Sequence, residues 1–299
     1  MATVYRNLFA MGTRFDLVLP DLEEEAGDYI FGLIKREIFR LQDMLSNYNE
    51  LSNLSVLNKT AFTGDIKVDE EMFDLAGILK SMYATSLGYF DVCAVSCVMS
   101  EPGVIEKNYK PAGPVATPKD IILDEKHRTI RFDKQGMLID SGGFGKGYAL
   151  EKVKKILLDH NILHAFISFG ESSVLALGDH PFGEGWKVSI PDSYASESVC
   201  IFHLKDNALS VSGNTPANKN KYPLGHIINP KTGIRESCQG IVCISGPSAF
   251  EAEILSTSLF LAGNDEQEQI LKNFEGYKAV RVLYDSENNK PSIQEIVLS

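Results

Sequence analysis

Strand-like segments in this chain come in runs, and helix-like segments stand between the runs. Residues 3–19 read as one or two strands broken near Met11-Gly12-Thr13, and strand patterns dominate again from Ala165 to Ser212. Shorter strands are expected at Ile121–Leu123, Thr129–Phe132, Met137–Ile139 and Ile241–Ser245, with a final hairpin over 278–284 and 292–298. Strands grouped in this way favour an α+β fold of mixed, largely antiparallel sheets packed with helices over a doubly wound sheet.

Helical periodicity begins after Pro20 and Asp21, where apolar residues recur every three or four positions as far as Leu45. Further helices are expected at about 69–86, 146–159, 248–262 and 265–273. Residues 100–118 hold four prolines and are expected to be an irregular connection. At about 150 residues per domain, we expect one unit over residues 1–299, or two lobes divided near 100–118.

The charge of the chain limits its partners. The net charge of −11 comes from 40 acidic and 29 basic residues, and an acidic surface repels phosphate backbones. Nucleic acid is therefore not expected as a partner. An anionic small ligand would need a local cation or oriented backbone N–H groups.

The cysteines and the N-terminal sequence indicate the cellular compartment. Five cysteines form no C-x-x-C pair and no zinc spacing, which suits buried thiols in a reducing compartment. No secretory signal, lipobox cysteine or stretch of 18 apolar residues is present, so no transmembrane segment is expected. A cytoplasmic protein is expected as the sequence is written, with an exported form trimmed of its leader as the alternative.

The glycine-rich segment Asp140–Tyr148 stands between an expected buried strand and a helix. Glycines there let a ligand approach the backbone, and the helix N-terminus offers N–H groups to a phosphate. Neither the Walker A spacing nor G-x-G-x-x-G is met. The alternative is a tight turn with Lys146 in solvent.

Two further motifs carry chemistry. His226, between apolar residues and an Asn-Pro turn, can be a general base near neutral pH or a structural histidine. Glu253 and Thr257 are four apart on one helix and can both offer oxygen to Mg²⁺, or Glu253 can simply complement the helix dipole. Gly88–Asp91 and Ser46–Tyr48 add aromatic and polar groups that can contact a heteroaromatic ring or close a core.

Taken in order, these motifs resemble the ApbE family, the FAD:protein FMN transferases. The resemblance covers residues 11 to 263 and rests on Met11–Thr13, Ser46–Tyr48 with Ser52, Leu54 and Asn58, Gly88–Asp91, Asp140–Tyr148, Phe169–Glu171, Ser212–Gly213, His226–Gly233 and Glu253–Gly263. It implies an ApbE-like fold. It also implies cleavage of the FAD pyrophosphate, transfer of FMN to a Thr or Ser hydroxyl of an acceptor flavoprotein, and release of AMP.

Site residues follow from the same resemblance. The flavin nucleotide pocket would be lined by Met11, Tyr48, Tyr89, Phe90, Asp91 and Ile228, and the loop containing Gly142, Gly145 and Lys146 would hold the pyrophosphate. His226 would take the proton of the acceptor hydroxyl. The Gly145 carbonyl, Glu253 and Thr257 would hold Mg²⁺, with Mn²⁺ as the alternative ion.

The chain departs from the family pattern at four places. Glu253 replaces the usual Asp, Gly170-Glu171-Ser172 replaces Gly-Gly-Asp, Asn229 replaces Asp, and Gly145 replaces a common Ala. Three alternatives stay open: an FAD pyrophosphatase that yields FMN and AMP with the same metal and pocket, a non-catalytic flavin-binding protein, which Glu253 favours, and an α+β binding module without flavin.

Overall fold

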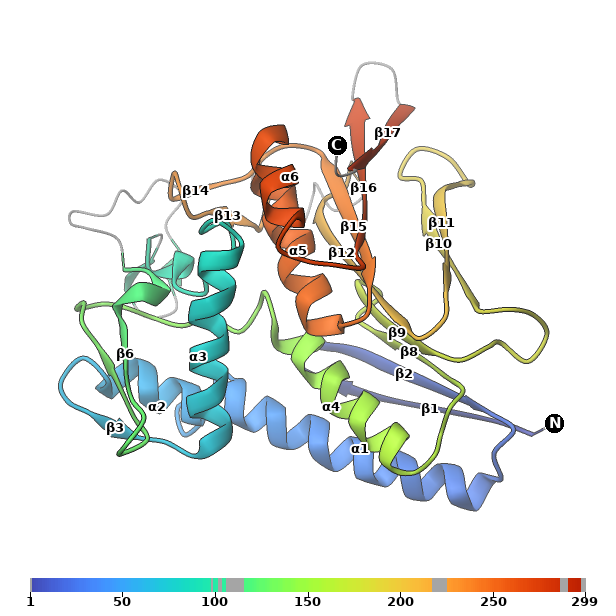
Figure 1. Cartoon of the computed structure of the whole chain (residues 1–299), viewed down its shortest axis with the longest axis horizontal. Coiled ribbons are helices and arrows are strands. Elements are labelled where there is room, and N and C mark those ends of the chain that lie inside the picture. Colours follow the sequence, from blue (N-terminus) through green and yellow to red (C-terminus); the bar gives the residue numbers. More distant parts are fainter. Residues whose placement is uncertain are drawn as a thin grey trace. The chain divides into compact units, whose positions relative to one another are not determined.

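The computed structural model describes residues 2–97, 99–101, 104–105, 116–216, 225–285 and 290–296 (Figure 1). The chain forms two compact units, and each is described by itself. Unit 1 comprises Met1–Gln42, Phe144–Gly225 and Ser237–Ser299. Unit 2 comprises Asp43–Gly143 and His226–Glu236.

Unit 1 is built on an eight-stranded sheet with the order β1-β2-β8-β9-β12-β15-β16-β17. Every strand pair that the structure describes is antiparallel. The strands are β1 (Thr3–Ala10), β2 (Thr13–Pro20), β8 (Ala165–Phe169), β9 (Ser173–Leu177), β12 (Asn207–Asn214), β15 (Gly240–Gly246), β16 (Lys278–Asp285) and β17 (Lys290–Ile296). The expected α+β architecture with antiparallel sheets is confirmed.

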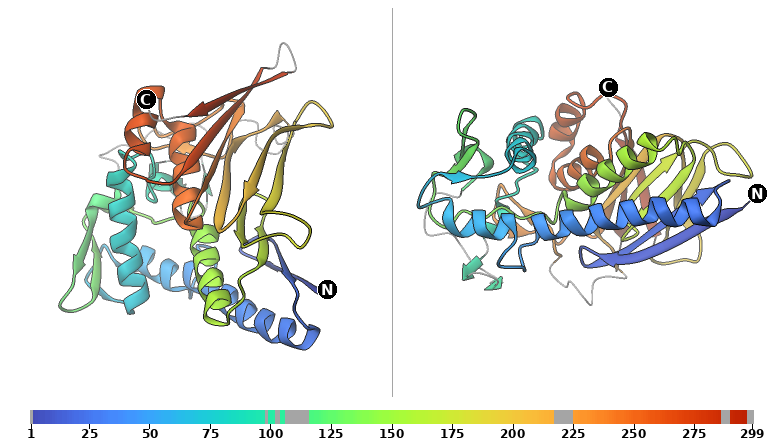
Figure 2. Two further views of the ribbon diagram at one scale, coloured as in Figure 1. Left: turned by 45° about the vertical axis from the view of Figure 1, so that its right-hand side comes forward. Right: turned by 90° about the horizontal axis from the view of Figure 1, so that it is seen from below.

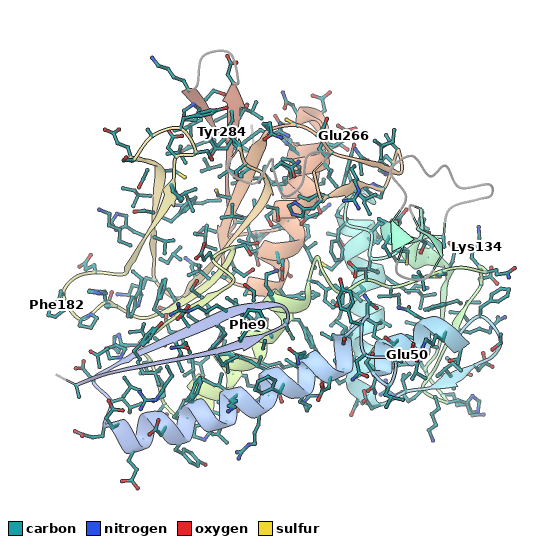
Figure 3. All side chains as sticks on the ribbon, turned by 180° about the vertical axis from the view of Figure 1, so that it is seen from behind. Phe9, Glu50, Lys134, Phe182, Glu266 and Tyr284 are labelled. Atoms are coloured by element: carbon teal, nitrogen blue, oxygen red, sulfur yellow. The ribbon has the colours of Figure 1, made fainter. Side chains whose placement is uncertain are left out.

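The first hairpin shows how local sequence determines this sheet. Met11 and Gly12 connect β1 to β2 with φ angles of 48° and 74°. Two central residues with positive φ make the turn whose twist matches antiparallel strands. On β1, Val4 and Ala10 are buried, whereas Phe9 is 69% exposed and lies on the outer surface (Figure 3).

The two faces of the sheet in unit 1 are covered differently. On β12, Ser210 and Ser212 face helix α5 (Ala249–Leu261), whereas Leu209 faces the opposite side because side chains alternate along a strand. That opposite side packs against a ribbon of β10 (Trp186–Pro191) and β11 (Ser198–Leu204) around Trp186 and Cys243 (Figure 2). The other helices of unit 1 are α1 (Glu24–Leu45, to Gln42), α4 (Gly145–Asp159) and α6 (Asn264–Leu271).

Unit 2 is smaller and carries short elements. Its three-stranded sheet has the order β3-β7-β6, and two further strand pairs are β4–β5 and β13–β14. The elements are α2 (Asn53–Thr60), β3 (Ile66–Lys67), α3 (Glu70–Thr85), η1 (Ala94–Cys97), β4 (Met99–Glu101), β5 (Val104–Ile105), η2 (Pro118–Asp120), β6 (Ile121–Asp124), β7 (Thr129–Phe132), β13 (Ile228–Asn229) and β14 (Ile234–Arg235).

The structure differs from the sequence-based expectation in two places. Helix α2 was not expected; Ser52 caps it by accepting a hydrogen bond from the Ser55 N–H at 2.9 Å. The expected strand Met137–Ile139 is wrong, because the backbone of Leu138 and Ile139 bonds to the Ser96 and Asn58 side chains and not to a neighbouring strand. Most of residues 100–118, where a division into lobes was expected, lie outside the described residues. Within the described part of the chain, no helix is both long and apolar enough to cross a membrane.

Candidate functional site

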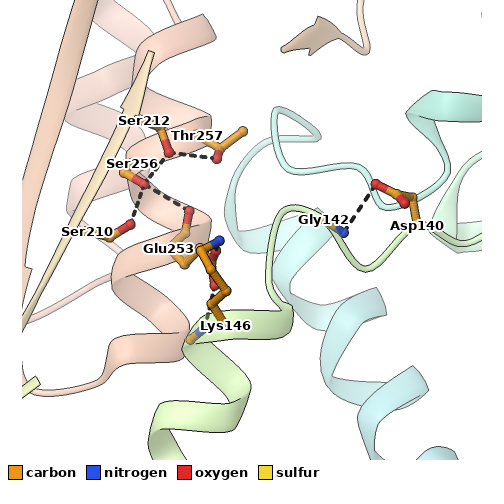
Figure 4. Close-up of polar contacts among 9 residues, drawn as sticks. Asp140, Gly142, Lys146, Ser210, Ser212, Glu253, Ser256 and Thr257 are labelled. Atoms are coloured by element: carbon orange, nitrogen blue, oxygen red, sulfur yellow. Dashed lines mark hydrogen bonds and ion pairs between the residues drawn. The ribbon is translucent and has the colours of Figure 1, made fainter. Parts of the chain in front are cut away.

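The glycine-rich turn of unit 2 is held by side chains from distant segments. Asp140 accepts a hydrogen bond from Asn47 Nδ2 at 2.8 Å. It accepts a second from the Gly142 N–H at 3.2 Å (Figure 4). Asn58 accepts from the Ile139 N–H at 2.8 Å and donates to the Ile139 carbonyl at 2.9 Å. Burial raises the pKa of Asp140 above its ordinary value, and the bonds from Gly142 and Asn47 oppose that shift. The turn is therefore built before any ligand arrives.

The loop that supplies Asn47 is itself fixed by α2. Ser52 Oγ and Ser55 Oγ both donate to the Ser46 carbonyl, and Ser46 Oγ accepts from the Tyr48 N–H at 3.1 Å. The Tyr48 side chain is 98% exposed. The Tyr48 side chain can therefore contact a ligand that arrives from solvent, but it does not pack against the other described side chains of unit 2.

The segment after α3 supports the same turn. Phe90 is 3% exposed, and its ring lies 3.5 Å from where a Cβ on Gly143 would be. The Asp140 N–H donates to the Val92 carbonyl at 2.8 Å. Of the predicted flavin residues, Phe90 therefore packs beneath the glycine-rich turn and does not reach solvent.

Asp91 is the titratable group of this segment. Its Oδ1 accepts from the Cys93 N–H at 2.7 Å. Burial raises the pKa of Asp91 to about 7; the Cys93 N–H opposes the shift, the Asp120 charge adds to it, and the Lys231 charge opposes it. Asp91 can therefore exchange a proton near neutral pH.

The His226 motif of unit 2 forms a small hairpin. Its strands β13 and β14 pair Ile228 with Arg235, and Asn229 accepts from the Gly233 N–H at 2.8 Å. Lys231 donates to the Leu87 carbonyl at 2.6 Å and lies 5.1 Å from the centre of the Tyr89 ring. The lysine therefore joins the hairpin to the Gly88–Asp91 segment, a role that the sequence did not suggest.

His226 itself stands at a bend just before β13, and its side chain is exposed. Ile228 is partly buried. Within unit 2 the structure thus places Phe90 against Gly143 of the glycine-rich turn, with Asp91 next along the chain, and Tyr89 beside Lys231 of the His226 hairpin. Two surface hollows of unit 2, lined by residues such as Phe62 and Asp74, contain none of the predicted site residues.

Met11 is the predicted flavin residue of unit 1. Its N–H donates to Gln42 Oε1 at 2.7 Å, and its side chain is partly buried. Beside it, a Cβ on Gly170 would lie 2.8 Å from the Thr13 side chain. This close approach places the segments Met11–Thr13 and Phe169–Glu171 side by side.

The predicted metal residues lie where α4 and α5 of unit 1 pack together. The Glu253 side chain is 5% exposed, and its two carboxylate oxygens accept from Lys146 Nζ and from the Gly147 N–H (Figure 4). A Cβ on Gly147 would lie 2.5 Å from the Ala249 carbonyl oxygen, so only glycine permits this contact. The N-terminus of α4 also favours a carboxylate electrostatically.

A chain of hydroxyls continues from Glu253 along α5. Ser256 Oγ donates to the Glu253 carbonyl at 3.0 Å and contacts Ser212 Oγ at 2.7 Å; Ser212 Oγ lies 3.2 Å from Thr257 Oγ1. The predicted placement of Glu253 and Thr257 on one helix is observed. Ser210 was not singled out from the sequence and Ser212 was named only as part of a motif, although two serines two positions apart on a strand share a face.

The three predicted metal residues offer the kind of donor atom that Mg²⁺ requires. The Glu253 carboxylate, the Thr257 hydroxyl and the Gly145 carbonyl are oxygen donors, which Mg²⁺ prefers, and it takes few protein ligands. No cluster of three or more His, Cys, Asp or Glu occurs among the described residues. The chemistry fits a hard cation, although Lys146 already neutralises Glu253.

Comparisons with known proteins identify the family and the fold. The FAD:protein FMN transferase of Klebsiella pneumoniae (strain 342) is 22% identical over 305 residues, covering 94% of this chain and 84% of that protein. The flavin transferase ApbE from Vibrio cholerae superposes with a TM-score of 0.81 at 17% identity, over 99% of this chain and 98% of that one. The ApbE protein from Thermotoga maritima gives 0.79 at 22% identity, over 98% and 97%. The model of the ApbE family matches residues 11–281, and the chain therefore belongs to the ApbE family.

Proposed function

We propose that this chain is an FAD:protein FMN transferase. It cleaves the pyrophosphate of FAD, places FMN on a Thr or Ser hydroxyl of an acceptor flavoprotein and releases AMP. The observation that supports this most is the prebuilt glycine-rich turn, which Asn47, Asn58 and Asp140 hold immediately before the N-terminus of α4. Backbone N–H groups at such a turn bind phosphate without reorganisation.

Binding of FAD is assigned to the residues that the family resemblance names. The segment Gly142–Lys146 receives the pyrophosphate, since it combines glycines with a lysine. Met11, Tyr48, Tyr89, Asp91 and Ile228 contact the flavin nucleotide, and Phe90 supports the turn from below.

His226 is assigned as the base. Its exposed imidazole can reach the hydroxyl of an incoming protein, and histidine is the side chain that most often acts as a general base. Proton removal from the hydroxyl makes it a stronger nucleophile toward the phosphorus that carries the FMN half. The bond to AMP breaks as the new bond to the acceptor oxygen forms.

Glu253, Thr257 and the Gly145 carbonyl are assigned to Mg²⁺, with Mn²⁺ as an alternative ion. When bound, the ion supplies positive charge that neutralises the pyrophosphate and stabilises the leaving AMP. Because Glu253 has a longer arm than the Asp usual in the family, the site can suit the larger Mn²⁺.

Two other functions are separable by experiment. A pyrophosphatase would pass the FMN half to water, and a non-catalytic flavin-binding protein is favoured by the pairing of Glu253 with Lys146. Purified protein is incubated with FAD and Mg²⁺, with and without a Thr-containing acceptor, and AMP and free FMN are quantified. Transfer predicts AMP that depends on the acceptor, with little free FMN. AMP with equal FMN identifies the pyrophosphatase, and absence of AMP with every divalent ion identifies the binding protein.

The metal assignment has its own test. Glu253→Gln keeps the shape of the side chain but removes its charge, so release of AMP should fall at least about 100-fold while FAD affinity changes little. Full activity in Glu253→Gln would remove Glu253 from the metal site. Glu253→Asp restores the usual residue of the family and should retain activity.

A further inference from the structure

Both oxygens of the Glu253 carboxylate have a partner inside unit 1. One oxygen pairs with Lys146 Nζ and the other accepts from the Gly147 N–H. The Glu253 side chain is 5% exposed and the Lys146 side chain 21% exposed. A buried carboxylate without a counter-ion is costly, so Lys146 stabilises it in the absence of other cations.

Packing fixes where the carboxylate stands. Gly147 has no room for a Cβ, because Phe250 Cα and the Ala249 carbonyl oxygen would lie 2.9 and 2.5 Å from it. Phe250 also packs its ring against Phe144 and Tyr148, with ring centres 6.2 and 5.9 Å apart. The α4–α5 contact therefore cannot open easily, and the mobile partner is the four-carbon arm of Lys146.

Two cations at one buried carboxylate repel each other strongly. We propose that the Lys146 ammonium and a divalent ion are alternative occupants of the Glu253 carboxylate, so that the ion binds only when Lys146 swings away. This inference rests on the assignment of Glu253 to the metal in the proposed function. An anionic phosphate that attracts Lys146 would free Glu253, and phosphate and ion would then bind with positive coupling.

The length of the side chain at position 253 determines whether its carboxylate reaches Lys146. An Asp at this position would withdraw the carboxylate from α4 by about one carbon–carbon bond, roughly 1.5 Å. The longer arm of Glu253 reaches the N-terminus of α4 and Lys146. The internal ion pair is therefore tied to the residue by which this chain departs from the family pattern.

The test measures Mn²⁺ binding by electron paramagnetic resonance on protein without FAD or acceptor. Lys146→Met should bind Mn²⁺ about tenfold or more tightly than wild type, because the competing charge is gone. Lys155→Met is the matched control: it removes a charge from the same helix, where Lys155 pairs with Asp159 and is 71% exposed. Its Mn²⁺ affinity should equal that of wild type. Adding Glu253→Gln to Lys146→Met should abolish the gain.

Equal or weaker Mn²⁺ binding by Lys146→Met overturns the proposal, as does a gain that survives Glu253→Gln. If Lys146→Met folds poorly, wild type provides the second measurement. Acetylation of Lys146 by acetic anhydride, followed by mass spectrometry, should rise severalfold with saturating Mn²⁺ while acetylation of Lys155 stays constant. Unchanged acetylation of Lys146 contradicts the exchange. Because no FAD is present, these results are independent of whether the protein transfers FMN.

Discussion

Asn58 bonds both backbone groups of Ile139, accepting from its N–H at 2.8 Å and donating to its carbonyl at 2.9 Å. The two residues are 81 positions apart. The amide side chain thus takes the place of a neighbouring strand and fixes the residue just before Asp140.

Asn58→Ala should destabilise the protein by about 1–3 kcal/mol, because it leaves two backbone groups of Ile139 without their partner. Urea unfolding monitored by circular dichroism measures this free energy. Asn53→Ala, at an exposed position in the first turn of α2, is the control and should change stability by less than about 0.5 kcal/mol. Equal stability of the two variants would show that the Asn58 bonds are dispensable.

Gly147→Ala tests the α4–α5 contact. The added methyl would stand 2.5 Å from the Ala249 carbonyl oxygen, so overpacking should cost about 1–3 kcal/mol. Gly32→Ala is the matched helical control, since nothing lies within 4 Å of its Cβ position, and should stabilise by about 0.5–1 kcal/mol. The midpoint of thermal unfolding is measured for both variants. A Gly147→Ala protein as stable as wild type would mean that α4 and α5 lie further apart than in the structure.

Asp91 should make stability depend on pH. Burial raises its pKa from 3.8 to about 7, so the folded state holds the proton more tightly than the unfolded state. Its contribution to stability is full below about pH 4 and is lost as pH rises through about 7. Asp91→Asn stays neutral, so its stability relative to wild type should increase by about 1 kcal/mol between pH 6 and pH 8.5. Urea unfolding at the two pH values measures the difference; a constant difference would place the pKa of Asp91 in its ordinary range.

His226→Ala separates catalysis from binding. Loss of a general base should slow flavin transfer at least about 100-fold while leaving FAD affinity nearly unchanged. Transfer is followed by flavin attached to the acceptor, and affinity by titration of flavin fluorescence. Parallel loss of affinity and transfer would make His226 a contact of the ligand instead of a base.

Most of the secondary structure could be predicted because it depends on local periodicity. The alternation in Thr13–Pro20 and the apolar stripe of α1 are visible in any short window. Helix α2 was not predicted, because its eight mostly polar residues show little periodicity and its start depends on the cap that Ser52 provides. Met137–Ile139 looked like a strand because it is apolar and buried, but its partners include the Asn58 and Ser96 side chains.

The sequence predicted which residues belong to the candidate site, but not which of them contact one another. Spacing alone put Glu253 and Thr257 on one face of a helix. The pairing of Glu253 with Lys146 joins residues 107 positions apart and depends on the close approach at Gly147. The position of Lys231 against Leu87 likewise depends on how two loops of unit 2 pack, for which the sequence carries no local signal.

Covalent flavin on an acceptor protein tests the proposed function most directly. The protein is mixed with FAD, Mg²⁺ and a Thr-containing acceptor, and the acceptor is separated under denaturing conditions and analysed by mass spectrometry. The prediction is an acceptor that carries FMN on one Thr, with an equal amount of AMP released, and no addition to an acceptor whose Thr is replaced by Ala. An unmodified acceptor, in the presence of bound FAD and divalent ion, would contradict the transferase.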